Sequence, residues 1–317
     1  MNNKKIFIWV GVSLIVFLSL SAVVMSYLAF KERNKQQTVI IKSEPPAYKV
    51  FIPQVPQEME FCGEMVPLDD IDVRERVERE LIVNAHWYSA TILYLKRANR
   101  WFPVIEPILK KYGIPDDFKY LAVIESGLSN VVSPAGAAGF WQFMEPAGKK
   151  HGLEINNEVD ERYHVEKATV AACKYLKESH LKYKSWTLSA ASYNYGLNGI
   201  DRQIDRQKTN NYYNLYLNEE TYRFVARILA IKEIFENPSK FGFELKPEEL
   251  YPEIPSKKIM VKTGIENLAD FATQNGINYK ILKIMNPWLR DKTLINKFGK
   301  SYTILIPGSD EFLLENE

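Results

Sequence analysis

The chain has 317 residues, enough for two small domains with separate cores, and 46% hydrophobic and 25% charged residues are ordinary proportions for a globular protein. The net charge of +2 is unevenly divided, because residues 1–36 carry +4 and leave −2 for the rest. The basic excess therefore lies beside an apolar segment, which argues against a nucleic-acid-binding protein.

That apolar segment, residues 6–30, contains no charged residue. A helix of this length, at about 1.5 Å per residue, exceeds the roughly 30 Å hydrocarbon core of a bilayer. A cleavable signal peptide is the alternative, but its apolar region is usually about 7–15 residues long. Residues 1–36 are therefore predicted to form a retained single-pass membrane anchor. Lysine and arginine flank both ends, so charge does not decide its orientation.

Residues 37–68 are predicted to be an extended, poorly packed tether, because prolines recur along them. These are Pro45, Pro46, Pro53, Pro56 and Pro67.

Residues 69–237 are predicted to form a mainly α domain, since no alternating strand pattern of any length occurs there. Apolar residues recur at three- and four-residue steps in five stretches, 69–83, 84–100, 103–112, 168–176 and 221–235. The fourth has a face of small residues suited to close helix packing. In the second, the aromatic and aliphatic residues are expected in the core; they are Trp87, Ile92, Leu95 and, just beyond it, Trp101.

Another helix begins near Pro115, with Asp116 and Asp117 placed to cap its free N–H groups. Its buried face is predicted from the spacing of Phe118, Leu121 and Ala122, and the next position on that face is Glu125. Ser126-Gly127 then ends the helix. A poorly solvated carboxyl group has a raised pKa and can hold a proton near neutrality, as a general acid must. A single glutamate in such a place is more often a pairing or helix-end residue.

Further motifs follow this glutamate in a fixed order. They are Glu125-Ser126, Ser133-Pro134-x-Gly136, Gly139-Phe140-Trp141-Gln142, Ser192-Tyr193-Asn194-Tyr195-Gly196 and Glu220-Thr221-x-x-Phe224-Val225. Together they resemble the signature of the lytic transglycosylases, whose catalytic domain is lysozyme-like. Several motifs in order over about 100 residues are far more specific than any one alone.

The resemblance implies a cofactor-free enzyme that cleaves the β-1,4 bond between N-acetylmuramic acid and N-acetylglucosamine in peptidoglycan. Glu125 would act first as acid and then as base, closing a 1,6-anhydro ring on the muramic acid. A wall-cutting domain lies outside the cytoplasm, so the resemblance places it in the periplasm, held in the cell envelope by an inner-membrane anchor. It does not say whether strands are cut at their ends or within.

The resemblance also assigns substrate-binding residues. These are Ser126, Ser133, Gln142, Tyr193, Asn194 and Glu220. Tyr193 would also orient Glu125, and Glu220 is equally suited to a structural ion pair. Trp141 and Phe143, expected within a helix, suit either the groove or the core. Phe224 replaces a common tyrosine and Tyr195 a small alanine, departures that affect subsites rather than the reaction.

Residues 238–256 hold four prolines and are predicted to be a linker. Residues 257–308 follow the order strand, helix, helix, strand and resemble a LysM module, a type of domain that binds N-acetylglucosamine chains. The predicted elements are 259–261, 268–275, 279–285 and 302–307, with Asn286-Pro287 ending the second helix and 309–317 as a tail. The match is looser here, because Thr263–Asn267 departs from the usual motif and Asp291–Lys300 is long.

Other chemistries find little support. The four histidines show no metal-ligand spacing, so no metal is expected; they are His86, His151, His164 and His180. Cys62 and Cys173 are expected to be independent thiols. Two alternatives remain: a hydrolase of the same bond resembling goose-type lysozyme, and a non-catalytic protein that only binds peptidoglycan.

Overall fold

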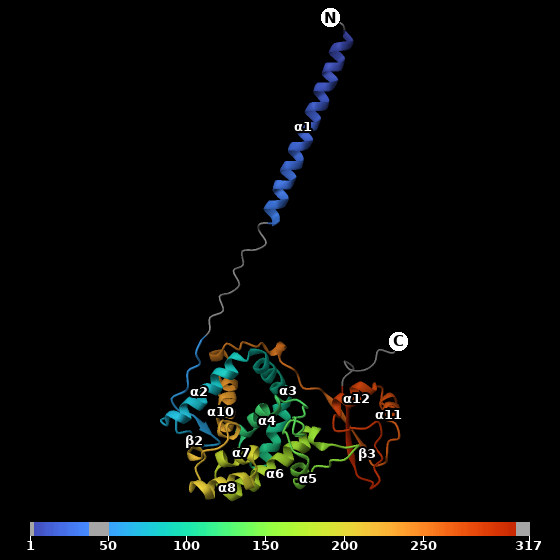
Figure 1. Cartoon of the computed structure of the whole chain (residues 1–317). Helices are drawn as coiled ribbons and strands as arrows, with labels where there is room; N and C mark the ends of the chain where they lie inside the picture. Colours follow the sequence, from blue (N-terminus) through green and yellow to red (C-terminus); the bar gives the residue numbers. More distant parts are fainter. Residues whose placement is uncertain (1–2, 38–50, 309–317) are drawn as a thin grey trace. The chain divides into compact units, whose positions relative to one another are not determined.

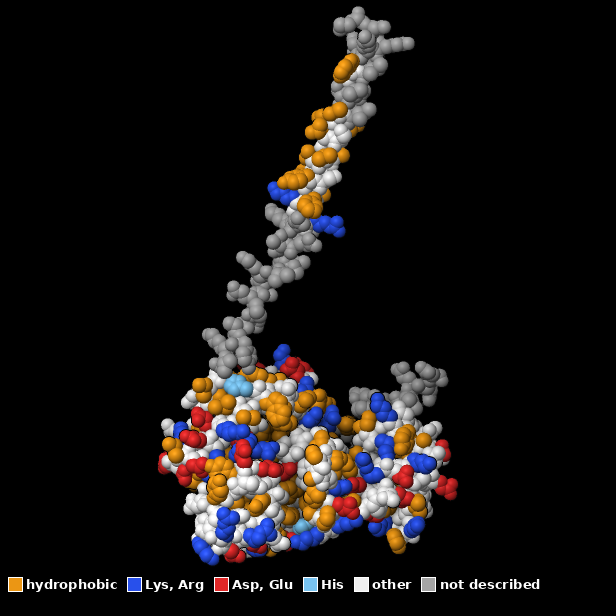
Figure 2. Space-filling view, viewed as in Figure 1, with side chains coloured by type: hydrophobic (Ala, Val, Ile, Leu, Met, Phe, Trp, Pro, Cys, Tyr) orange, Lys and Arg blue, Asp and Glu red, His pale blue; other side chains and the backbone are white. Residues whose placement is uncertain are grey.

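The computed structural model describes residues 3–37 and 51–308, and the chain divides into two compact units, Met1–Ile52 and Pro53–Glu317. The first unit contains helix α1, Asn3–Gln37, which is blue in Figure 1. Hydrophobic side chains run along its described part in Figure 2. Where side chains are described, which in α1 means Trp9 and residues 16–33, no helix is long and apolar enough to cross a membrane. Most of the predicted tether, residues 38–50, lies outside the described residues.

The second unit is mainly helical, as predicted, and most of its α-helices are labelled in Figure 1. The helices before residue 240 are α2 Ile71–His86, α3 Tyr88–Tyr112, α4 Lys119–Ser126, α5 Glu145–Lys150, α6 Val165–Tyr183, α7 Trp186–Tyr195, α8 Leu197–Gln207, α9 Glu219–Tyr222 and α10 Phe224–Glu236. A two-stranded hairpin, β1 Glu60–Phe61 and β2 Glu64–Met65, precedes them. Helix α10 packs against α2, α4 and α7, while α6 packs against α3 and α7.

The small-residue face predicted on α6 is confirmed, because Ala168 and Ala172 are fully buried. The predicted separation of 84–100 from 103–112 is wrong: residues 84–86 end α2, and the rest of both stretches from Tyr88 on belongs to α3, which contains Pro103 and Pro107. Each proline leaves the carbonyl four residues earlier without its helical partner. Both prolines are exposed, so water can solvate those carbonyls and the helix continues.

Other expectations about α3 fail at its first turns. Trp87 and Ile92 are 56% and 36% exposed and are not core residues. They lie near the junction of α2 and α3, at the end of the amphipathic pattern. The helix predicted over 221–235 is also interrupted, since Arg223 separates α9 from α10.

The last part of the predicted tether is well packed, contrary to expectation. Phe61 is fully buried and its ring contacts Phe118 edge-on, with 5.3 Å between ring centroids. Glu64 accepts hydrogen bonds from the backbone N–H groups of Trp186 and Thr187 at the start of α7. A carboxylate at a helix N-terminus is stabilising there. The hairpin is therefore part of the helical domain.

The predicted linker also packs against the domain. Phe241 and Phe243 are both 3% exposed, and the Arg100 and Asn99 side chains of α3 donate hydrogen bonds to carbonyls of Pro252 and Tyr251. The predicted linker thus contains two short 3₁₀ turns, Pro238–Phe241 and Pro247–Glu249, and it lies against α3.

The C-terminal domain, red in Figure 1, has the predicted strand–helix–helix–strand order. Its elements are β3 Ser256–Val261, α11 Leu268–Gln274, α12 Tyr279–Met285 and β4 Tyr302–Pro307. Strands β3 and β4 are antiparallel, with Ser256 opposite Pro307 and Val261 opposite Tyr302. Fully buried Asn286 ends α12, and its side chain bonds the backbone of Leu282 and Leu305. Its amide thereby joins α12 to the sheet.

Candidate active site

Helix α4 presents Glu125 one residue before its end. Phe118, Leu121 and Ala122 are fully buried, which confirms the predicted apolar face beneath the glutamate. Gly127 ends the helix with φ +59° and donates to the carbonyl of Val123 at 2.8 Å. A Cβ on Gly127 would lie 2.5 Å from the Tyr94 ring, so both the backbone angle and the space favour glycine.

Glu125 is partly exposed as a residue, but burial of its carboxyl group raises the pKa of that group from 4.5 to about 7. Two charges modify this effect: Arg227 lowers the pKa and Glu220 raises it. Among the described residues, none donates a hydrogen bond to this carboxyl group. The predicted rise of the pKa is therefore confirmed, and its cause is desolvation without a stabilising donor.

The expected caps of this helix are wrong. A 3₁₀ turn, Asp116–Phe118, leads into α4, and neither aspartate caps it. Asp116 pairs with Lys119 at 2.6 Å, and Asp117 pairs with Lys232 at 2.9 Å and accepts from the Cys62 N–H at 2.7 Å. Both carboxylates are thus held in ion pairs at the opposite end of α4 from Glu125.

Two arginines that sequence reasoning missed hold the other end of α4. Arg227 of α10 donates to the carbonyl of Ile124 at 3.0 Å, and Arg97 of α3 donates to that of Gly127 at 2.9 Å. Cations are favourable at a helix C-terminus, where carbonyls lack partners. Arg227 follows Phe224 by three positions and so lies on the inner side of its helix. A charged residue on that side was the sequence signal that could have indicated its role at the end of α4.

The loop after α4 uses its polar side chains internally. Ser126 Oγ lies 2.9 Å from the carbonyl oxygen of Phe140, and Ser133 Oγ accepts from the Ala137 N–H at 3.0 Å. Gln142 has φ +47°, and its Nε2 donates to the carbonyls of Val131 and Gly139. No described residue donates to the Oε1 of Gln142. This oxygen is therefore an acceptor without a donor among the described residues.

Trp141 and Phe143 belong to the core. Trp141 is fully buried and donates from Nε1 to Thr169 Oγ1 at 2.9 Å. Phe143 is 4% exposed and contacts the Tyr193 ring edge-on at 5.8 Å. Trp141 lies in a turn and Phe143 in a short antiparallel bridge with Ala138, so the expected helix is wrong. Of the two expected roles, groove or core, both residues have the core role.

The remaining predicted site residues come from α7 and α9. Tyr193 donates its hydroxyl to the carbonyl of Trp141 at 2.8 Å instead of to Glu125. Burial raises the pKa of Tyr193, and the charge of Glu125 adds to the rise, so the two groups interact electrostatically without a direct bond. Asn194 Nδ2 donates to Glu220 at 2.8 Å, and its Oδ1 accepts from Thr221 at 2.6 Å.

Glu220 is exposed and forms no ion pair with any described residue, so the structural alternative for it finds no support. Of the six predicted substrate-binding residues, Glu220 raises the pKa of Glu125, and the charge of Glu125 in turn raises the pKa of Tyr193. Ser126, Ser133 and Gln142 make hydrogen bonds within the loop after α4, whereas Asn194 bonds Glu220 and Thr221.

The described residues contain no cluster of His, Cys, Asp or Glu suited to a metal ion. His151 is bonded to Glu178 at 3.1 Å, and His180 stacks on Trp186 with 3.6 Å between ring centroids. Burial lowers the pKa of His164 to about 4. Cys62 and Cys173 are both free thiols, as expected. Burial raises the pKa of each, so neither is a reactive thiolate near neutrality.

Comparison with known proteins agrees with this geometry. Residues 103–216 match the family model of the transglycosylase SLT domain, and residues 257–310 match that of the soluble lytic transglycosylase C-terminal LysM-like domain. The first range contains Glu125, Gln142 and Asn194, whereas Glu220 and Arg227 lie beyond it.

Two curated relatives from Escherichia coli, strains K12 and O6:H1, are each called membrane-bound lytic murein transglycosylase D. Each is 26% identical over 241 residues, which cover 74% of this chain and 51% of the relative. The chain thus spans about half the length of these relatives. It contains a transglycosylase SLT domain and a LysM-like C-terminal domain, and is homologous to membrane-bound lytic murein transglycosylase D.

Proposed function

We propose that this protein is a peptidoglycan lytic transglycosylase that uses Glu125 as its only catalytic carboxyl group. The observation that carries the proposal is the Glu125 carboxyl group, which has no hydrogen-bond donor among the described residues and whose pKa burial raises to about 7, on a residue that is partly exposed. Such a group exists in both protonation states near neutrality. It can therefore give up a proton in one step and accept one in the next.

In the first step, protonated Glu125 donates its proton to the oxygen joining C1 of N-acetylmuramic acid to N-acetylglucosamine. The C1–O bond breaks, and the sugar's own N-acetyl oxygen stabilises the positive charge at C1. In the second step, the Glu125 carboxylate removes the proton from the muramic C6 hydroxyl, and O6 bonds to C1. The 1,6-anhydro ring forms without water, and Glu125 regains its proton.

A mechanism with two carboxylates fits the site less well. Glycosidases with a nucleophile or base place a second Asp or Glu across from the acid. Here Asp116 and Asp117 are held by lysines, and Glu220 is the carboxylate whose charge acts on Glu125. Glu220 is exposed and bonded to Asn194, so we assign it to substrate binding.

We assign the other five predicted residues to the glycan groove as a second part of the proposal. Gln142 Oε1 would accept a hydrogen bond from the glycan, while Ser126 and Ser133 fix the loop that carries it. Asn194 would bind a sugar N-acetyl group or hold Glu220 toward it, and Tyr193 supports Phe143 beneath the loop.

The decisive test is mass spectrometry of purified peptidoglycan digested by the full-length protein, with Glu125→Gln as control. We expect muropeptides one water lighter than hydrolysis products, and none from the variant. Ordinary reducing muramic acid ends would instead identify a hydrolase of the goose-type lysozyme kind. Binding without products from either protein would identify a peptidoglycan-binding protein.

We place the protein in the cell envelope, with residues 6–30 in the inner membrane and the folded unit in the periplasm. The 25 residues without a charge support this, as does the membrane-bound relative. Extraction of cell membranes with alkaline carbonate tests it. Release of the protein into the soluble fraction would contradict the anchor. Protection of the folded unit from added protease until the inner membrane is ruptured would contradict its periplasmic location.

A further inference from the structure

The C-terminal domain shares a hydrophobic core with the catalytic domain. Ten of its buried residues cluster with three from the catalytic domain, Ala138, Val159 and Tyr163. Ala138 belongs to the loop that carries Gln142. Trp288 stacks on His164 at 5.9 Å, and the Arg290 guanidinium lies 4.2 Å from the centre of the Tyr163 ring. A merely tethered binding module would share no core with its neighbour.

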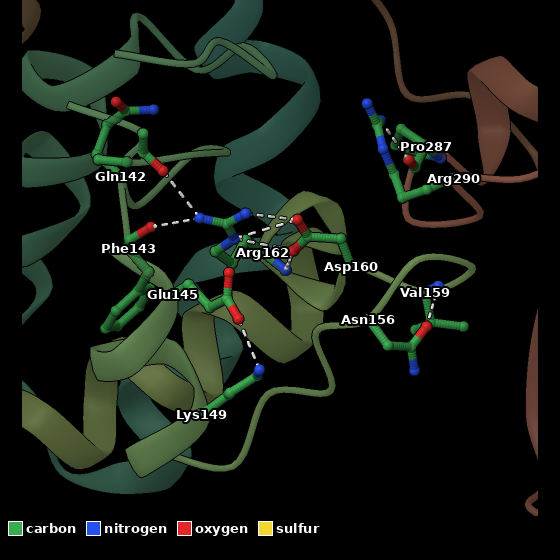
Figure 3. A network of polar contacts seen from close by, with 12 residues as sticks. Gln142, Phe143, Glu145, Lys149, Asn156, Val159, Asp160, Arg162, Pro287 and Arg290 are labelled. Atoms are coloured by element: carbon green, nitrogen blue, oxygen red, sulfur yellow. Dashed lines mark hydrogen bonds and ion pairs between the residues drawn. The ribbon is translucent and has the colours of Figure 1, made fainter. Parts of the chain in front are cut away.

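The backbones of the two domains also pair. Val159 and Leu289 form an antiparallel bridge, in which the Asp160 N–H donates to the Trp288 carbonyl at 2.9 Å and the Arg290 N–H donates to the Glu158 carbonyl at 2.7 Å. Residues 287–290, which we call the docking segment, therefore act as a short strand added to residues 158–160. Figure 3 labels Pro287, Arg290 and Val159 to the right of Asp160 and Arg162.

Asp160 connects this backbone pairing to the loop that carries Gln142. Its carboxylate accepts from Arg162 Nε at 2.9 Å and Nη2 at 2.7 Å, and the two side chains are 9% and 11% exposed. Arg162 Nη1 then donates to the carbonyls of Gly136 at 3.0 Å and Phe143 at 3.2 Å, as Figure 3 shows for Phe143. These two carbonyls lie at either end of residues 136–143, which we call the Gln142 loop.

The loop has little freedom to move away from Arg162. Gly139 has φ +79°, and a Cβ there would lie 1.9 Å from the Arg162 carbonyl oxygen. The Ala138 N–H donates to Phe143 and the Gly139 N–H to Val131, which closes the loop. Gln142 holds a left-handed backbone conformation that non-glycine residues adopt at a cost. Gln142 itself bonds Gly139 within the loop, and Arg162 bonds the carbonyls at the two loop ends.

We infer that the C-terminal domain holds the Gln142 loop in its active arrangement through the Asp160–Arg162 pair, which makes both of them positioning residues. The inference rests on the proposed function for its effect on the reaction. The domain would then act on turnover, in addition to any affinity it has for sugar. Small displacements of a substrate-positioning group are costly to the rate.

The experiment compares four variants of the full-length protein: Asp160→Asn, Arg162→Lys, Leu289→Ala and Leu268→Ala. Leu268 and Leu289 are both fully buried in the shared core, but only Leu289 belongs to the docking segment. The two leucine variants should therefore lose similar stability, as thermal unfolding will show. Leu268→Ala is the matched control for destabilisation alone.

The first readout is hydrogen exchange at the Ala138, Gly139 and Gln142 amides, which does not depend on activity. We expect roughly tenfold faster exchange in Asp160→Asn, Arg162→Lys and Leu289→Ala, and little change in Leu268→Ala. If these amides exchanged equally fast in Leu289→Ala and in the control Leu268→Ala, the inference would be overturned. Failure of the wild type to form anhydro products would overturn the proposed function and leave this readout intact.

The second readout separates kcat from KM for anhydro-product formation. We expect kcat to fall roughly 10- to 100-fold in the first three variants, with KM changed less than about threefold. Asp160→Asn combined with Leu289→Ala should cost less than the product of the two single effects, because both act through one route. A raised KM at unchanged kcat in these three variants would overturn the inference, because the C-terminal domain would then only help to bind the glycan. If Leu289→Ala fails to fold, Arg162→Lys decides, since it keeps the charge and loses the bridging geometry.

Discussion

Two carboxyl groups of the same helical domain, Glu125 and Asp160, differ in how many hydrogen-bond donors surround them. Asp160 accepts hydrogen bonds from the backbone N–H, Nε and Nη2 of Arg162. Glu125 accepts none from any described residue, and burial raises its pKa to about 7. The same functional group is thus a fixed structural support where donors surround it. It is a titrating acid where apolar contacts surround it.

The largest expected effect comes from removing the unsatisfied carboxyl group. Glu125→Gln should lower turnover about 10²- to 10⁴-fold, the contribution that general acid–base groups make. The same change should stabilise the fold at pH 8 by about 3 kcal/mol, because ionising a carboxyl group with a raised pKa disfavours the folded state. Wild-type stability should accordingly fall as pH rises from 4.5 to about 7. Denaturant titrations at pH 5 and 8 measure this, and a less stable variant at pH 8 would contradict it.

Removing the satisfied carboxylate should have the reverse effect on stability. Asp160→Ala leaves Arg162 buried and without its partner, which should cost about 3–5 kcal/mol, as for other broken buried pairs. Lys149→Ala, which breaks an exposed pair with Glu145 in the same network (Figure 3), is the control and should change little. Urea unfolding of both variants tests the contrast. Equal losses would mean that the Asp160 pair carries no special weight.

Charges near Glu125 should move its titration in opposite directions. Activity needs protonated Glu125 in the first step, so kcat/KM should decline above about pH 7. Arg227→Gln removes a charge that lowers this pKa and should move the decline to higher pH; Glu220→Gln removes one that raises it and should move the decline to lower pH. Each shift should be roughly one pH unit or less. Arg227→Lys, which keeps the charge, is the control. If Arg227→Gln and Glu220→Gln shifted the decline in the same direction, Glu125 would not be the group whose titration sets it.

The smallest effect is expected at Tyr193. Tyr193→Phe removes one hydrogen bond, to the Trp141 carbonyl, and should cost about 1 kcal/mol of unfolding free energy. Because the hydroxyl does not bond Glu125, the pH at which kcat/KM declines should stay where it is. A pH–rate profile checks this. A shift comparable to that of Glu220→Gln would show that Tyr193 orients the acid directly.

The sequence permitted prediction of Glu125 because its environment is local. The apolar spacing from Phe118 to Ala122 and the break at Gly127 place it within a single short helix. Arg227 lies 102 positions later and reaches the same helix end only because α10 packs on α4. No periodic pattern carries that information, although a charge on the inner side of α10 hints at it.

The Asp160–Arg162 pair illustrates the opposite case. In the sequence, Asp160 to His164 has the composition of a solvated surface turn. Its burial follows from the docking segment, more than 120 residues later, which covers it. Phe61 was missed for a similar reason: prolines predicted an extended chain correctly, but the surface that receives Phe61 is built by α4 and its preceding turn. Local composition predicts backbone conformation better than it predicts tertiary contacts.

The hairpin β1–β2 is the first regular secondary structure of the folded unit that begins at Pro53. Its Glu64 is bonded to the N-terminus of α7, and the Cys62 N–H is bonded to Asp117 just before α4. The start of this folded unit is thereby bonded next to the two helices that carry Tyr193 and Glu125. Displacement of the hairpin would therefore also disturb the elements that position the candidate site.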